Sequence, residues 1–247
     1  MFHRVFVLAI LCCSFDSIKC SQRHIALVDI VRMGEDYHGH IHVDGNPIKL
    51  NLTRPGTTIF TPEFRLTAAT ADQWGNVIYE DITPTVNLTH VEESIYEDEE
   101  ANAIFRVHHV DGKIRMIRMH GIMDNIHIAH DGEDHFAVIH DYSTPPKASG
   151  KDYIPIEGPL EFDSSVEPRQ MSTVYPELYI TVDNKMWRDL KQDNSYTLAY
   201  LSVFMRGVNN RYKTVSDPSI QYRVVTATIL NVNLMIFWHH QARNPVQ

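Results

Sequence analysis

Apolar and polar residues alternate in short runs through the first half of the chain. Alternation with a period of two is typical of β-strands that bury one face. The pattern predicts strands at residues 25–31, 38–42, 48–52, 103–110, 113–119 and 136–140. No long stretch of this half has the three-and-four spacing of an amphipathic helix, so residues 21–141 are predicted to be mostly β.

The pattern changes after residue 173. A short apolar strand is predicted at residues 178–182, followed by a short helix at 184–191. A longer helix is predicted at 198–212, and a strand rich in β-branched residues at 220–230. Strand, helix and strand in this order are the start of an α/β sandwich. The predicted fold class of the whole chain is therefore α+β.

The predicted helix at 198–212 has one apolar stripe, because its large apolar residues recur at spacings of three and four. These residues are Leu198, Leu201, Phe204, Met205, Val208 and Tyr212. We expect Asp193, Asn194 or Ser195 to cap the helix by accepting a backbone N–H bond.

Residues 142–173 lie between the two regions. They contain five prolines and little periodicity, which predicts a linker. An exposed linker is also where a chain is most easily cut, so we expect proteolytic processing here.

The N-terminal residues have the layout of a secretory signal peptide at residues 1–20. Arg4 precedes an unbroken apolar run at residues 5–13, and small or polar residues follow. We expect cleavage between Ser14 and Ser21. The apolar run is too short for a membrane span, which takes roughly 20 residues. The mature protein is expected to be soluble and secreted.

All three cysteines, Cys12, Cys13 and Cys20, lie in or at the end of this leader. The mature chain would then have no internal disulfide and would depend on its apolar core. Two sequons support export, since Asn51 and Asn87 each stand two residues before a threonine. Both are predicted glycosylation sites.

The net charge of −9 and the pI near 5.9 argue against nucleic acid or an anionic membrane as the main partner. Either partner would need a basic face to offset its own negative charge.

Two patterns in residues 174–247 resemble those of a known protease family. Residues 177–183 read ELYITVD, and Tyr200, Phe204, Val208, Asn209 and Tyr212 follow on the predicted helix. These match the first strand and first helix of the catalytic domain in reprolysin-type (adamalysin-type) secreted zinc endopeptidases of the tick salivary kind. Residues 21–141 resemble the propeptide of those enzymes, through the sequences IYEDEE and HHVDGKIRMIRMHG.

The resemblance implies a precursor with four parts. A leader at 1–20, a propeptide-like region at 21–141 and a processing linker at 142–173 precede the first part of a metzincin α/β catalytic domain at 174–247. Extracellular proteins would be the substrates. In the family, two histidines of an H-E-x-x-H motif bind zinc, and the glutamate activates water. The sequence contains no His-Glu pair, so we name no catalytic residue and expect this polypeptide to be inactive alone.

Glu177 stands where the family has a glutamate that helps to bind a structural calcium ion, so the resemblance implies calcium binding there. A solvated acid at a strand start is the alternative, because calcium needs 6–8 oxygen ligands.

Histidines form two further candidate metal sites, although a polar surface row is the favoured explanation of each, because neither group has a spacing specific to zinc. One group is His38, His40 and His42; the other is His127, His130 and His135. The adjacent pair His239 and His240 would point to opposite faces of a strand and would not share a metal.

The resemblance also raises the question of how the propeptide-like region would keep the catalytic domain inactive, a property called latency. With no cysteine after the leader except Cys20, a carboxylate or an imidazole would have to block zinc, and Asp131, Asp134 and His135 are the candidates.

A second class of function stays open. A secreted, non-enzymatic β-rich binding protein would have the same acidity and glycosylation. Such a carrier would close a barrel around a ligand cavity, and the chain would be one domain with the C-terminal helix packed against the barrel. The protease precursor instead needs two domains joined by the proline-rich linker.

Overall fold

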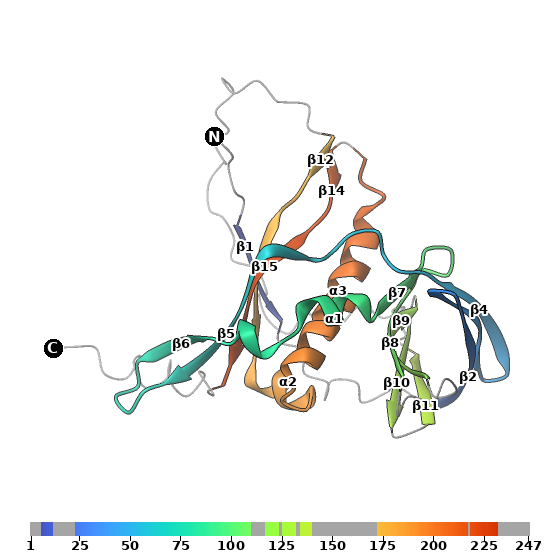
Figure 1. Ribbon diagram of the computed structural model, residues 1–247, viewed down its shortest axis with the longest axis horizontal. Helices are drawn as coiled ribbons and strands as arrows, with labels where there is room; N and C mark the ends of the chain where they lie inside the picture. The colour runs from blue at the N-terminus through green and yellow to red at the C-terminus, as the bar shows by residue number, and fades with distance from the viewer. Residues whose placement is uncertain are drawn as a thin grey trace, which may run out of the picture.

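The computed structural model describes residues 6–11, 23–109, 117–123, 125–131, 134–139, 172–216 and 218–231. An eight-stranded sheet and a five-stranded sheet lie on either side of a long helix (Figure 1), and a third sheet has two short strands. The predicted fold class, α+β with mostly β structure, is confirmed. The predicted linker lies outside the described residues, apart from its last two.

The eight-stranded sheet has the strand order β4-β3-β2-β11-β10-β9-β8-β7. Every neighbouring pair is antiparallel, and all pairs except β2 and β11 are close in sequence. Its strands are β2 (Arg23–Met33), β3 (Asp36–Val43), β4 (Asn46–Leu52), β7 (Ile95–Asp98), β8 (Ala103–His109), β9 (Ile117–Met123), β10 (Ile126–Asp131) and β11 (Asp134–Ile139). All six strands predicted in this half are present; the one predicted at 113–119 corresponds to β9, of which Ile117–Met123 are described.

The two ends of this sheet meet. Thr53, directly after β4, forms an antiparallel bridge with Glu97 of β7, and their backbones exchange two N–H···O bonds of 2.9 Å. The sheet therefore closes into a barrel. Side chains from all around it form one buried cluster: Ala26, Tyr37, Ile41, Val43, Leu50, Leu52, Tyr96, Ala103, Phe105, Val107, Met123, Ile128 and Ala137.

Two glycines let neighbouring strands approach closely in the barrel. A Cβ atom at Gly121 would lie 2.0 Å from the carbonyl oxygen of Ile104, and one at Gly39 would lie 2.0 Å from that of Asp29. Any larger residue would force the strands apart, so these positions help the sheet to bend.

The five-stranded sheet has the order β1-β13-β15-β5-β6, and its strands come from distant parts of the chain. They are β1 (Phe6–Leu11), β5 (Phe60–Ala71), β6 (Val77–Asp81), β13 (Glu177–Val182) and β15 (Arg223–Leu230). All neighbours are parallel except β5 and β6, which form a hairpin. The two-stranded sheet joins β12 (Thr173–Val174) to β14 (Ser219–Ile220).

Three α-helices accompany this sheet: α1 (Leu88–Glu93), α2 (Asn184–Asp189) and α3 (Asn194–Tyr212). Helix α3 begins four residues earlier than predicted. Of the three predicted caps, Asp193 is the one used, and its carboxylate accepts a 2.9 Å bond from the N–H of Tyr196.

Helix α3 lies between the two sheets, and its burial is therefore wider than the predicted stripe (Figure 1). Leu198, Leu201 and Met205 are buried as predicted, whereas Tyr212 is 38% exposed. Gly207 allows α3 to pack closely against the barrel, since a Cβ atom there would lie 2.8 Å from the Cδ1 of Ile122 in β9.

The second core is shared by both halves of the sequence. From the first half it takes Ile59, Phe60, Phe64, Leu66, Val91, Ile95 and Ile104, and from the second it takes Leu178, Ile180, Val182, Met186, Leu190, Leu198, Ala199, Leu201, Val203, Met205, Val224, Ala227 and Ile229. Strand β5 lies in the predicted propeptide-like region, yet it pairs with β15 of the predicted catalytic region. The predicted boundary is therefore not a boundary between sheets.

Among the described residues, no helix combines the length and the apolar character that a membrane span requires.

Candidate functional site

Glu177 is the first residue of β13, half-buried and in register with Arg223 of β15. Calcium binding takes 6–8 oxygen ligands. In the described part of the chain, no three side chains of His, Cys, Asp or Glu come together as metal ligands, at Glu177 or elsewhere. The described residues thus offer no ligand set that fits zinc either, and a calcium role for Glu177 stays a prediction.

His38, His40 and His42 lie on the outer face of β3, because Tyr37, Ile41 and Val43 face the barrel core. This placement on one face agrees with the prediction. The rings of His40 and His42 are 6.2 Å apart, and the Nδ1 of His38 lies 3.1 Å from the Oδ1 of Asn51. The geometry is that of a polar surface row.

The second histidine group does not share one face. His130 and His135 are directly opposite on β10 and β11, with ring centroids 6.1 Å apart. His127 is three residues from His130 on the same strand, so it points to the other face. The expectation that all three would gather is wrong for that reason.

The latency candidates lie at the end of the same hairpin, where Asp131 and Asp134 are in register. The described residues contain no zinc site against which these candidates can be tested, so their role stays a prediction. His239 and His240 lie outside the described residues.

The two sequon asparagines differ in accessibility. Asn51 is half-buried in β4, and its backbone N–H donates a 2.6 Å bond to the buried carboxylate of Asp98. Asn87 is exposed and caps α1, where its Oδ1 accepts a 3.0 Å bond from the N–H of His90. A glycan attached to its Nδ2 would leave that cap in place, so Asn87 has the better geometry for modification.

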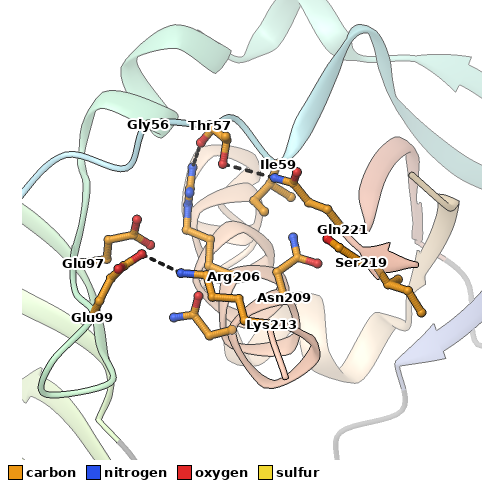
Figure 2. A pocket seen from close by; sticks show the side chains of 12 residues that line it. Gly56, Thr57, Ile59, Glu97, Glu99, Arg206, Asn209, Lys213, Ser219 and Gln221 are labelled. Atoms are coloured by element: carbon orange, nitrogen blue, oxygen red, sulfur yellow. Dashed lines mark hydrogen bonds and ion pairs between the residues drawn. The ribbon is translucent and has the colours of Figure 1, made fainter. Parts of the chain in front are cut away.

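A cavity of about 380 Å³ lies where α3, β7 and the loop after β4 meet (Figure 2). Its lining comprises Gly56, Thr57, Ile59, Glu97, Glu99, Arg206, Asn209, Asn210, Lys213, Ser219, Ile220 and Gln221. Both halves of the sequence contribute, so the cavity is another part of their common interface.

Arg206 is the central residue of this lining and is only 4% exposed. Its Nη2 donates to the carbonyl oxygen of Thr57 at 2.8 Å and to Oε2 of Glu92 at 2.7 Å. The Oε1 of Glu92 accepts the backbone N–H of Ile59 at 3.1 Å. One buried ion pair thus fastens the loop before β5 and helix α1 onto helix α3.

The other cation of the cavity is also paired. Lys213 donates to Oε1 of Glu99 at 2.6 Å across the rim (Figure 2). This bond, and then the positive charge of Lys213, hold the pKa of Glu99 below its usual value. With its cations neutralised by carboxylates, the cavity is organised to join two parts of the chain.

Asn209 and Tyr212, two of the pattern residues on α3, contact Tyr222, the residue directly before β15. The side chain of Asn209 accepts the N–H of Tyr222 at 2.8 Å and donates to its carbonyl oxygen at 3.0 Å. The ring of Tyr212 stands edge-on to the ring of Tyr222 at 5.0 Å. A side-chain hydrogen bond with Tyr212, followed by burial, raises the pKa of Tyr222.

Sequence reasoning missed the pair between Arg206 and Glu92. Arg206 directly follows the apolar Met205, and a cation beside the buried stripe of a helix is a signal that a buried partner exists. Nothing in the sequence indicates which of the acids at residues 92–100 is that partner.

The sequence matches no protein-family model and no curated protein.

Proposed function

We propose that the chain belongs to a secreted zinc metalloendopeptidase precursor of the reprolysin type. Residues 21–141 act as its propeptide-like region, and residues 174–247 are the first part of its catalytic domain. The 247-residue polypeptide by itself does not hydrolyse peptides, because its sequence has no H-E-x-x-H motif.

The contacts made by the pattern residues carry this proposal. The ELYITVD segment forms strand β13 and, at Asp183, the cap of α2; the patterned helix is α3, and β15 follows in parallel beside β13. Asn209 and Tyr212 fasten the end of α3 to Tyr222, directly before β15. The pattern therefore has a structural purpose, which is to hold one strand–helix–strand unit together.

The alternative, a β-rich carrier protein, has two observations in its favour. The core that residues 21–141 and 174–247 share departs from the two separate domains that the precursor implies. The barrel is closed and α3 packs against it, as that class of protein would require. The barrel interior, however, is filled by large side chains such as Phe105, Leu50 and Ile128, all fully buried. A carrier needs that space for its ligand, so the precursor is the better-supported function.

The test is a pair of peptidase assays with a chelator control. The purified 247-residue chain, supplied with zinc and calcium, should leave a quenched fluorescent peptide library uncut. A longer product of the same gene that contains H-E-x-x-H should cut it, and its Glu→Gln variant should not. Chelator-sensitive cleavage by the 247-residue chain, or the absence of the motif from every transcript, would contradict the proposal.

A further inference from the structure

Strand β1 lies inside the predicted leader, yet it is an integral strand of the five-stranded sheet. It pairs in parallel with β13 at six consecutive positions, from Phe6 opposite Glu177 to Leu11 opposite Val182. Because β1 is the terminal strand of that sheet, its removal with the leader would make β13 the terminal strand.

The edge left on β13 is suited to accept another strand. A terminal strand carries backbone N–H and C=O groups without partners, and proteins commonly protect such edges with proline, lysine or a bulge. The segment Glu177–Val182 has neither proline nor lysine, and its only charged residue is Glu177. The register between β13 and β15 shifts after Leu178, but the extra residue, Val225, belongs to β15. Leu178, Ile180 and Val182 are buried in the shared core, so removing the neighbouring strand would bring water to one side of that core.

We propose that, once the leader has been removed, the edge of β13 binds an extended apolar strand of a partner polypeptide. The proposal rests on cleavage of the leader and does not depend on the protease proposal. The incoming strand is about six residues long, since six positions of β13 pair with β1.

The chemistry of this partner follows from the sheet. The neighbours β13, β15 and β5 all run parallel, and β1 joins them in the same direction. Strands of parallel sheets are rich in continuous apolar residues. The β1 sequence FVLAIL is such a run, so it is an internal example of what the edge accepts.

A second copy of this chain is a poorer occupant. Two copies of β13 related by two-fold symmetry would pair antiparallel, in contrast to the parallel direction that β1 takes. The partner is therefore an apolar segment that differs from β13.

The experiment uses the secreted protein with its N-terminus determined by mass spectrometry. A synthetic peptide of residues 5–11, made soluble by terminal lysines, is added at increasing concentration. Hydrogen exchange should slow by about ten-fold or more at alternate amides of β13, because a parallel strand directs successive N–H groups to opposite neighbours. The midpoint of thermal unfolding should rise with peptide concentration.

The control is a peptide with proline in place of both Leu8 and Ala9. Because successive N–H groups point to opposite sides of a strand, one of the two lost donors faces β13, so this peptide cannot pair fully and should have no effect. Changing the peptide avoids any variant of the protein that fails to fold. The proposal would be overturned if the two peptides protected β13 equally, or if neither protected it. It would also be overturned if the secreted protein retained residues 6–11, or if it formed a dimer that protects β13 without added peptide.

Discussion

The barrel and the five-stranded sheet differ in how far apart their neighbouring strands lie in the sequence. In the barrel, only the pairing of β2 with β11 and the closing bridge from Thr53 to Glu97 join distant segments. In the five-stranded sheet, only the hairpin of β5 and β6 is local. Local pairings form faster because they close shorter loops. The barrel is therefore expected to form first and to present β5 and α1 to the C-terminal segment.

The largest expected effect comes from truncating one residue in each core. Phe105→Ala, in the barrel core, should cost about 3–5 kcal/mol, and Leu201→Ala, in the shared core, about 2–5 kcal/mol. Urea unfolding measures both losses. Hydrogen exchange then separates them, because Leu201→Ala should expose amides of β13 and β15 while those of β2 and β3 stay protected. Equal loss of protection in both sheets would contradict the expected difference between the barrel and the five-stranded sheet.

The buried ion pair tests how the two regions are joined. Glu92 and Arg206 have side chains 12% and 5% exposed, so Arg206→Met should cost about 3–5 kcal/mol by leaving a carboxylate buried without its cation. Combining it with Glu92→Gln should cost less than the sum of the single changes. A double-mutant cycle by urea unfolding gives the coupling. Additive losses would show that the pair does not hold α1 to α3.

Each region contains a tyrosine whose raised pKa should make stability depend on alkaline pH. Burial, followed by the neighbouring Tyr96, raises the pKa of Tyr37 in the barrel core. Burial also raises the pKa of Tyr196 on α3, where the guanidinium of Arg106 lies 5.5 Å from the centre of its ring and opposes the shift.

In the unfolded chain, both tyrosine hydroxyls ionise near pH 10. In the folded state their pKa values are higher, so at this pH both side chains are still protonated. Their contribution to stability is thus complete below about pH 10 and is lost as pH rises through the raised values. Urea unfolding across this range measures the loss. Tyr37→Phe and Tyr196→Phe should each make the decline shallower, and an unchanged slope in either variant would contradict that assignment.

The smallest expected effect belongs to the exposed pair of Lys213 and Glu99, whose side chains are 55% and 72% exposed. Lys213→Ala should cost at most about 0.5 kcal/mol, since water and salt screen the pair. The lowered pKa of Glu99 makes this contribution present above the ordinary pKa of a glutamate, and it fades as pH falls through the lowered value. A cost that persists in high salt would contradict the assignment.

Much of the fold follows from local patterns. Alternation predicts β2, β3 and β4, and three-and-four spacing predicts α3 because a buried stripe recurs with the helical turn. Strand β5 was not predicted, and its partner β15 lies more than 150 residues along the chain. No local pattern indicates which distant strand β5 pairs with. Nor does any local pattern indicate that Arg206 forms an ion pair with Glu92. Residues 92–100 contain six acidic residues, and such a charge run predicts a solvated loop or a sheet edge. The segment does include β7, the last strand in the sheet order, but Ile95, Tyr96 and Asp98 are buried.

The central claim is that the predicted propeptide-like region and the predicted catalytic region share one core. A protease recognition sequence inserted between residues 145 and 150 tests it most directly. After cutting to completion, judged on a denaturing gel, the two fragments should elute from a sizing column as one particle with the mass of the uncut protein. They should separate only in denaturant. Separation of the fragments in native buffer would contradict the shared core.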